Sequence, residues 1–227
     1  MKVKTAFLFT IALFLFLPYH LSAEETPLLK WKKASEFCIK NTPALGDDGL
    51  FYTAAGMGIV AIDPTDGSVV WGPIIPPGCS SYFGGYGVSV GANGLIYAVG
   101  DWNSCRNGRL VAFHNYDGSI VWDHGDCPGV GNTSPHPRQT PALNEALNSL
   151  HFGSSCLCSV DMCTGDNNWS ASGGRYIGEG GIAIDSLNNV YYGTNNGAGG
   201  TNLVRSYSSG GSFRWGKIIG DRGSKIM

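Results

Sequence analysis

Charge is the scarcest feature of this 227-residue sequence. Asp, Glu, Lys and Arg together make up 14% of the residues, whereas an ordinary globular domain has about 25%. The formal net charge is -2 and no run of like charges occurs, so the sequence lacks the basic footprint by which proteins bind nucleic acid. Sustained helical periodicity is missing too. We therefore expect no nucleic-acid partner and little α-helix.

Several catalytic and metal-binding patterns are also absent. The sequence has no G-x-S-x-G nucleophile elbow, which disfavours a hydrolase of that kind. Its seven cysteines include no C-x-x-C pair, and one of its five histidines lies in the N-terminal apolar segment, so the spacing does not favour zinc. The stretch DPTDG at 63–67 could be mistaken for a calcium loop, but its aspartates are what a tight hairpin turn requires. We predict no metal site.

Only one long apolar run is present, at the N-terminus. Two lysines precede an apolar stretch over residues 6–18, which is followed by the small residues of LSA. This order is typical of a secretory signal peptide over residues 1–23, cleaved after Ala23. A retained membrane anchor is the alternative, but the stretch is shorter than the roughly 20 residues that a spanning helix needs. We predict a secreted or extracytoplasmic chain, residues 24–227, with no stable membrane span.

Glycine, in contrast, is abundant and recurs in register with tryptophan. The sequence holds 34 glycines, roughly twice the usual share. The stretch AIDPTDGSVVW at 61–71 recurs as AFHNYDGSIVW at 112–122, SVDMCTGDNNW at 159–169 and RSYSSGGSFRW at 205–215. Each copy has glycine at the sixth step and tryptophan at the tenth, at Gly67 and Trp71, Gly118 and Trp122, Gly165 and Trp169, and Gly211 and Trp215.

Each repeat divides into four short strands. Runs rich in β-branched and aromatic residues alternate with Gly, Asp and Asn turns, and in the first repeat these runs are PAL, LFYTA, IVAID and SVVW. The aromatic residue of the second strand is predicted at Tyr52, Tyr97, Phe152 and Tyr192.

The repeat length selects the architecture. From Trp31 onward the matching tryptophans lie 40 to 51 residues apart, and four-stranded units of about 40 to 50 residues are typical of β-propeller blades. A sandwich with even spacing is the alternative, which the matched glycines and tryptophans disfavour. We predict an all-β fold, a β-propeller of four-stranded antiparallel blades, with about four blades in residues 24–227 ending at Trp71, Trp122, Trp169 and Trp215.

The repeated motif resembles the tryptophan-docking motif of pyrroloquinoline-quinone-type (quinoprotein-like) β-propeller repeats. The third copy, with Asp161, Thr164, Gly165 and Trp169, and the first copy, with Asp63, match it best. The second copy departs with His114 in place of aspartate. The fourth departs most, with Arg205 for the small residue and Tyr207 for aspartate. The resemblance covers residues 31–215 and is specific for the repeat rather than for any chemistry.

The motif is interpreted as a packing device. Ala61, Ala112 and Ser159 are predicted to make room on one blade for an indole from its neighbour, and the glycines permit tight turns or close approach. Trp31, within LLKWKK at 28–33, is predicted to belong to a remnant of a fourth strand that precedes the first complete unit.

The resemblance implies a propeller of six to eight blades, more than the four found. We therefore expect a truncated reading frame, a fragment, or a half that self-associates through its open edge, because unpaired strand edges and blade faces invite association. A closed four-bladed ring is the alternative.

All seven cysteines follow the predicted signal peptide, which favours an oxidising compartment. Cys158 takes the third-strand position filled elsewhere by valine and is predicted to be a buried thiol in the core. Predicted disulfides join Cys38 to Cys79 and Cys105 to Cys127, although the connectivity stays open and the CLC stretch at 156–158 could also take part. Two glycosylation sequons are present, at Asn132 and Asn168.

Strand order predicts one functional face. The longest segments are the linkers between repeats and the loops between second and third strands, which share one end of each blade. Long loops on a rigid scaffold often carry binding residues. Aligning the repeats on their first strands predicts a set of residues that converge on the axis, namely Lys40, Asn41, Tyr86, Arg138, Gln139 and Glu179. They would hold a small polar ligand, with Arg138 the strongest anion contact. The alternative is that they only solvate the rim.

Two functions follow from these observations. The first is a secreted binding or scaffold propeller, which needs no catalytic motif and takes a protein or small polar partner. The second is a fragment of a quinone-dependent dehydrogenase, for which the resemblance implies pyrroloquinoline quinone with calcium as cofactors. The adjacent cysteine pair of such enzymes is missing here, so the first function is preferred.

Overall fold

The computed structural model describes residues 29–32, 41–54, 58–79, 83, 87–100, 109–125, 139–153, 156–172, 177–194 and 202–220. The chain divides into two units, residues 1–30 and 31–227, and every described strand belongs to the second. The described residues form sixteen β-strands and one short 3-10 helix, η1 (Glu145–Leu147). No helix among them has the length and apolarity that a membrane crossing requires.

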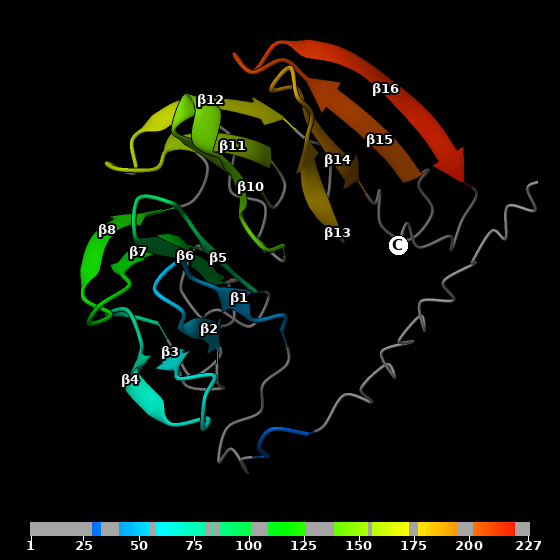
Figure 1. Ribbon diagram of the computed structural model, residues 1–227. Helices are drawn as coiled ribbons and strands as arrows, with labels where there is room; N and C mark the ends of the chain where they lie inside the picture. The colour runs from blue at the N-terminus through cyan, green and yellow to red at the C-terminus, as the bar shows by residue number, and fades with distance from the viewer. Residues whose placement is uncertain are drawn as a thin grey trace, which may run out of the picture. The chain divides into compact units, whose positions relative to one another are not determined.

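The strands form four antiparallel sheets, each with its strands in chain order (Figure 1). Blade one contains β1 (Ala44–Leu45), β2 (Phe51–Ala54), β3 (Ile59–Ile62) and β4 (Val69–Ile74). Blade two contains β5 (Val88–Val90), β6 (Leu95–Gly100), β7 (Arg109–His114) and β8 (Ile120–His124). Blade three contains β9 (Ala142–Asn144), β10 (Ser149–Gly153), β11 (Cys156–Asp161) and β12 (Asn167–Ser172). Blade four contains β13 (Ile177–Ile184), β14 (Val190–Thr194), β15 (Asn202–Tyr207) and β16 (Phe213–Gly220).

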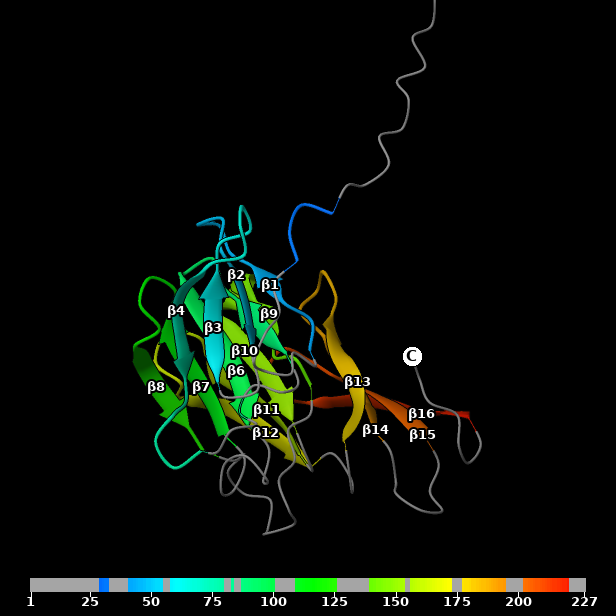
Figure 2. The same ribbon diagram turned by 90° about the horizontal axis from the view of Figure 1, so that it is seen from below.

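This arrangement confirms the predicted all-β fold of four-stranded antiparallel blades. The runs PAL, LFYTA, IVAID and SVVW correspond to β1, β2, β3 and β4, which follow one another across the sheet in Figure 2. The four sheets follow one another in chain order from blade one to blade four, and the described residues form an open propeller (Figure 1).

The strand register corrects the predicted aromatic positions in two blades. Directly opposed residues across the second, third and fourth strands form one row in each blade: Tyr52, Ala61 and Trp71; Tyr97, Ala112 and Trp122; His151, Ser159 and Trp169; Tyr191, Ser206 and Trp215. The predicted Phe152 and Tyr192 each lie one residue away. Since neighbouring residues of a strand face opposite sides of its sheet, a slip of one residue assigns the wrong face.

The fourth copy of the motif is also reassigned. Ser206, not Arg205, takes the small-residue position opposite Trp215. The turn that follows is one residue shorter than in blade one. Gly211 donates its N–H to the carbonyl three residues earlier, at Ser208, whereas Gly67 donates to Asp63, four residues earlier. Ser208 therefore replaces the motif aspartate, in place of the predicted Tyr207, and the fourth copy differs mainly in length.

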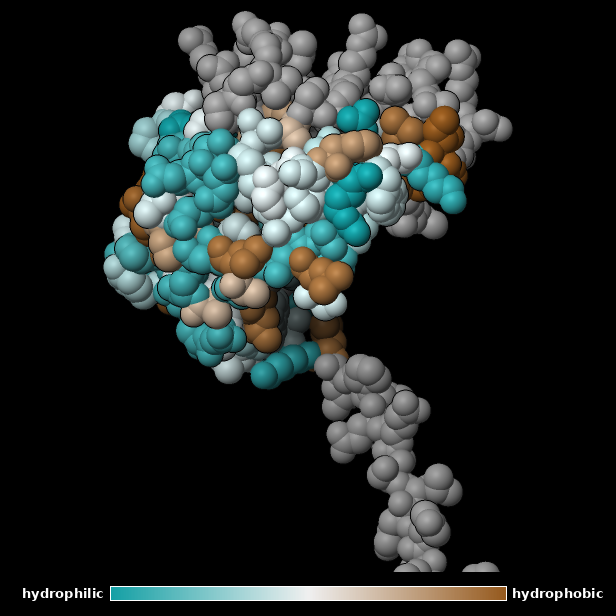
Figure 3. All heavy atoms as spheres, turned by 90° about the horizontal axis from the view of Figure 1, so that it is seen from above, coloured by the Kyte–Doolittle hydropathy of each residue, from teal (hydrophilic) through white to brown (hydrophobic). Residues whose placement is uncertain are grey.

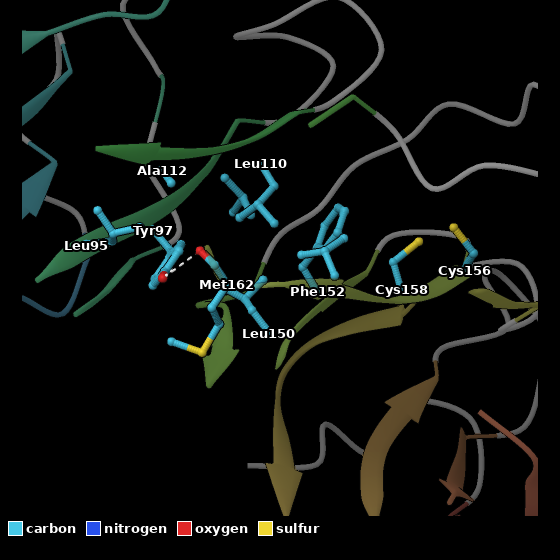
Figure 4. Close-up of a cluster of buried hydrophobic side chains, with 11 residues drawn as sticks. Leu95, Tyr97, Leu110, Ala112, Leu150, Phe152, Cys156, Cys158 and Met162 are labelled. Carbon is cyan, nitrogen blue, oxygen red and sulfur yellow. Dashed lines mark hydrogen bonds between the residues drawn. The ribbon is translucent and has the colours of Figure 1, made fainter. Parts of the chain in front are cut away.

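The core lies between successive blades rather than within one. A large buried cluster joins blades two and three, where Leu110 packs with Leu150 and Phe152 (Figure 4). Two further clusters join blade one to blade two and blade three to blade four. The faces between successive sheets are thus buried against one another, as in a propeller, whereas on the outer surface seen in Figure 3 hydrophobic residues lie among hydrophilic ones.

Candidate functional site

Three tryptophans tie each blade to the next, and a fourth, Trp31, docks on blade one in the same way. Each donates its indole N–H to a backbone carbonyl in the turn between the third and fourth strands of the following blade. The four bonds run from Trp31 to Pro64 at 2.9 Å, from Trp71 to Asn115 at 2.8 Å, from Trp122 to Met162 at 3.1 Å and from Trp169 to Ser209 at 2.8 Å. In every case the acceptor follows the motif position of Asp63 by one residue. We refer to these four side chains as the docking tryptophans.

Each docked indole lies directly against the motif glycine of the turn that it contacts. Gly67, Gly118, Gly165 and Gly211 have φ values of 73°, 72°, 76° and 82°, in the left-handed region that side chains disfavour. A Cβ atom built on any of them would lie 2.7 Å from an indole carbon of a docking tryptophan. Glycine is therefore needed both for the turn and for the contact.

This geometry corrects the predicted role of the small residues. The room for the incoming indole comes from the glycine of the next blade. Ala61, Ala112 and Ser159 instead lie beside the tryptophan of their own sheet. Trp71, Trp122 and Trp169 have the predicted packing role, with the glycine turn rather than the small residue as the docking surface.

Trp31 docks without forming a strand. Residues 29–32 carry no strand in the structure, so the predicted strand remnant is wrong for this described stretch. The indole nevertheless lies on Gly67 and stacks on Phe51, with ring centroids 6.0 Å apart and planes 5° apart. The repeat phasing at the N-terminal side of blade one is therefore correct.

The ring opposite each small residue completes the row. Its distance to the tryptophan of the same blade is 5.8 Å for Tyr52, 5.8 Å for Tyr97, 5.5 Å for His151 and 5.9 Å for Tyr191. Tyr97 donates its hydroxyl to the Met162 carbonyl at 3.0 Å, as Figure 4 shows, so it reaches the next blade as well. Burial raises the pKa of Tyr52 and of Tyr97, which keeps both phenols protonated.

His151 is the exception in this row. Its side chain is 1% exposed, and neither ring nitrogen has a hydrogen-bond partner among the described residues. Burial lowers the pKa of His151 to about 4, so the imidazole is neutral near pH 7. Histidine is not among the residues enriched in strands, whereas phenylalanine is, so the composition of the strand favours Phe152 over His151 for this position.

The register brings the segments of the predicted functional face to one end of each sheet. In blade one, Ala54 opposes Ile59, and Ile59 opposes Ile74. The connection from the second to the third strand and the linker that leaves the fourth strand therefore start at the same end. The same holds in blade two, where Gly100 opposes Arg109 and Leu110 opposes His124.

Two of the predicted ligand residues are described in full. Asn41 and Gln139 each lie three residues before the first strand of their blade, at equivalent positions in blades one and three. Asn41 accepts a hydrogen bond from the buried Thr53 hydroxyl at 2.7 Å, and Gln139 is 3% exposed. Both are thus well-held amides next to the innermost strands, β1 and β9.

The other four ligand candidates are placed less fully. Glu179 lies inside β13, in the part of the strand where the register with β14 shifts between Ile177 and Ile182. Lys40, Tyr86 and Arg138 lie outside the described residues. The convergence of the six residues on the axis therefore stays a prediction.

Arg109 is a residue at this end that the sequence did not single out. Its guanidinium forms an ion pair with Asp123 on β8, with Nε 2.8 Å from one carboxylate oxygen. It also donates from Nη1 to the Pro77 carbonyl at 2.6 Å. Arg109 thus ties the linker between blades one and two to the third and fourth strands of blade two. A single arginine in a polar loop gives no sequence signal for such a role.

The cysteines behave differently from the prediction. Cys79 and Cys158 are both disulfide-bonded. Cys158 is fully buried, as predicted, but it is not a thiol, and the two predicted pairs do not include it. Cys38, Cys105 and Cys127 lie outside the described residues. The valine found at this position in other blades indicated burial but carries no information about oxidation.

The two sequons also differ in what can be placed. Asn132 lies outside the described residues. Asn168 is exposed on β12, with its side-chain nitrogen 3.4 Å from the Ser159 hydroxyl. Its use for glycosylation stays a prediction.

Potential calcium ligands do not cluster within the described residues. Within them, no three His, Cys, Asp or Glu side chains come together as potential metal ligands. The placed candidates near the innermost strands, Asn41 and Gln139, offer neutral amides, whereas calcium sites draw mainly on carboxylates. The described part of the chain therefore shows no set of carboxylate ligands for calcium, and the quinone with calcium stays a prediction.

Comparison with known proteins supports the fold. No family model and no curated protein matches the sequence. Similar solved structures include BamB from Moraxella catarrhalis, at 16% identity and a TM-score of 0.61 over 83% of this chain and 56% of BamB. The quinohemoprotein alcohol dehydrogenase from Comamonas testosteroni has 19% identity and a TM-score of 0.62 over 81% of this chain and 35% of its own. A europium-containing methanol dehydrogenase has 15% identity and a TM-score of 0.61 over 84% and 44%.

The coverage and the sequence identity limit what these similar structures show. The chain spans between 35% and 56% of the length of these three proteins. At identities of 15% to 19% the likeness shows the fold alone. The chain thus has the β-propeller fold that these proteins share, with four blades described.

Proposed function

We propose that this chain is an extracytoplasmic β-propeller that binds or scaffolds a protein or a small polar ligand. The observation that carries this proposal is the docking network. Three indole hydrogen bonds and three glycine contacts join the blades in series, and a fourth of each places Trp31 on blade one, so the repeated motif has a packing role. What varies between blades is the set of segments at the shared end of the sheets, and a rigid scaffold with variable loops is suited to binding.

The proposed ligand-binding residues are those of the sequence prediction, led by Arg138 and Glu179. Two neighbouring observations support this set: Gln139, directly after Arg138, is buried, and Asn41 accepts a hydrogen bond from Thr53 next to an innermost strand. A cationic Arg138 would pair with a carboxylate or another anion.

The test is binding after Arg138→Ala and Glu179→Ala, with Leu187→Ala as the control. Leu187 is 75% exposed in the turn at the opposite end of blade four, so its loss should leave binding unchanged. The ligand can be sought with a panel of small sugars, dicarboxylates and aromatic acids by thermal shift. If both variants bind a hit as tightly as the unaltered protein, the proposed site is wrong.

The proposed location rests on the N-terminal segment. Cleavage after Ala23 would release residues 24–227 into an oxidising compartment, where the disulfides of Cys79 and Cys158 persist. N-terminal sequencing of the secreted protein tests the cleavage. Peptide mapping without reduction tests the pairs Cys38–Cys79 and Cys105–Cys127 and identifies the partner of Cys158.

The second candidate is a fragment of a quinone-dependent dehydrogenase. It is favoured by the fold shared with the quinohemoprotein alcohol dehydrogenase and the europium-containing methanol dehydrogenase. The test adds pyrroloquinoline quinone and calcium and follows both the absorbance of the quinone and the melting temperature. A spectral change with stabilisation would favour this candidate over the scaffold.

A further inference from the structure

Blade four presents a face that matches the inner blade faces but has no blade against it among the described residues. The row Tyr191, Ser206 and Trp215 has the same strand register as Tyr97, Ala112 and Trp122 in blade two. We call this row, with its neighbours Val204 and Lys217 on β15 and β16, the Trp215 face. Trp215 is 41% exposed, whereas each of the docking tryptophans is partly buried.

The surroundings of Trp215 are already arranged as in the docked blades. Its ring lies 5.9 Å from Tyr191, as Trp122 lies 5.8 Å from Tyr97. The residue before it, Arg214, donates to the Ser206 hydroxyl at 3.0 Å, as Asn168 donates to the Ser159 hydroxyl in blade three. The indole is therefore held in place by its own blade, and ordering it would cost a partner little.

The docked blades specify what would fit this face. The receiving surface is a turn between third and fourth strands with glycine at a φ of 72° to 82°. The carbonyl after the motif aspartate position must lie 2.8 to 3.1 Å from the indole nitrogen. A side chain at the glycine position would meet the indole at 2.7 Å. A generic apolar surface does not meet these requirements, but a further copy of the motif does.

The turn of blade one is the copy best able to provide this surface. The turns with Gly118, Gly165 and Gly211 are held between successive sheets by Trp71, Trp122 and Trp169. Among the described residues, the turn with Gly67 receives Trp31, from residues 29–32, which form no strand. A whole sheet with the Trp215 face would bury more surface on this turn than the indole of Trp31 does.

We propose that Trp215 of one chain docks on the Gly67 turn of a second copy of the same chain, displacing Trp31 there. The contact joins two different surfaces, so it is head-to-tail. Such contacts close into a ring when the rotation between copies allows and otherwise build a filament. The Trp215 face is thus an interaction surface for a second copy, and Trp31 acts as its competitor.

The test is the association of the purified protein over a range of concentrations by sedimentation velocity. We expect reversible dimers or larger species. Trp215→Ala should weaken association at least tenfold, since it removes the docking indole. Trp31→Ala should strengthen it severalfold, because it uncovers the Gly67 turn. Leu187→Ala, an exposed apolar change elsewhere on blade four, is the matched control and should have no effect.

Circular dichroism melting shows whether each variant is folded. If Trp215→Ala does not fold, Trp31→Ala alone decides, because a merely structural role of Trp31 predicts weaker association or none. The proposal is overturned if the unaltered protein is a monomer at all concentrations. It is also overturned if folded Trp215→Ala associates normally, or if Trp31→Ala does not strengthen association.

Discussion

Blades two and four carry the same tryptophan in the same register, yet the two indoles have different surroundings. Trp122 lies on Gly165 and donates to the Met162 carbonyl of blade three. Trp215 has no following sheet among the described residues and is 41% exposed. The motif therefore supplies only half of a docking site. The other half is the glycine turn of the next blade, so the stability that each tryptophan contributes depends on its neighbour.

The largest expected effect comes from removing the two tryptophans in turn and comparing the loss of stability. Trp122→Ala should lower the free energy of unfolding by about 3 to 5 kcal/mol, because it leaves a cavity between two blades. Trp215→Ala should cost less than about 1 kcal/mol in the monomer, as exposed substitutions usually do. Chemical denaturation at a concentration where the protein is monomeric measures both. Equal losses for the two variants would contradict the assigned difference.

A pH titration sharpens the comparison inside the row of rings. His151 takes the place held by tyrosine in the other blades, and its folded pKa of about 4 lies below its ordinary value of 6.5. Its contribution to stability is full above pH 6.5 and is lost as the pH falls toward 4, about 3 kcal/mol in total. Stability falls with falling pH because His151 in the unfolded chain, with the higher pKa, binds a proton before His151 in the folded protein does. Burial lowers the pKa of His124 as well, which adds a loss of the same sign.

The matched variant for this titration is His151→Phe. It should remove most of the loss between pH 6.5 and 4 and should not destabilise the protein at pH 7.5, because it deletes two buried nitrogens that lack partners. The denaturant midpoints of both proteins, measured at pH 7.5 and at pH 4, provide the test. An unchanged pH dependence in this variant would show that His151 is not the group responsible.

A pair of glycine substitutions separates the turn from the docking contact. Gly118 and Gly49 both have positive φ, at 72° and 82°, so alanine strains both turns. A Cβ at Gly118 meets Trp71 at 2.7 Å, whereas at Gly49 it meets nothing within 4 Å. Gly118→Ala should therefore cost about 1 to 3 kcal/mol more than Gly49→Ala, the penalty of overpacking. Equal costs would mean that the indole contact is unimportant.

The smallest expected effect on stability is that of Arg109→Ala, which frees the linker between blades one and two. Arg109→Ala should change the free energy of unfolding by only about 1 kcal/mol or less, since its ion pair with Asp123 is partly exposed. It should nevertheless increase hydrogen exchange of the linker around Pro77, because the guanidinium no longer holds that carbonyl. Lys217→Ala, on the fourth blade, is the control. Unchanged exchange near Pro77 would remove Arg109 as an anchor.

The sequence predicted the blades well because their signal is repeated. Glycine and tryptophan at constant spacing mark the turn and the fourth strand, and both have direct steric reasons. The failures came where one residue decides the outcome. A turn shortened by one residue moved the fourth motif from Arg205 to Ser206, and the slip from His151 to Phe152 exchanged the two faces of β10. Spacing alone cannot detect either change.

The candidate site was less predictable than the fold. Asn41 and Gln139 were located correctly next to the first strands because strand order fixes where linkers join a sheet. The role of Arg109 depends on a contact with a backbone carbonyl 32 residues away, which leaves no pattern in the sequence. The oxidation of Cys158 likewise depends on a partner brought near by folding.

Indole N–H exchange tests the central claim most directly. With the tryptophans labelled with nitrogen-15 and the protein kept monomeric by dilution, the exchange of each assigned indole N–H can be followed by NMR. We predict slow exchange for Trp71, Trp122 and Trp169, whose N–H groups are bonded to the next blade, and fast exchange for Trp215. Equally fast exchange at Trp122 and Trp215 would contradict the docking network, and a protected Trp215 in the monomer would contradict the open face of blade four.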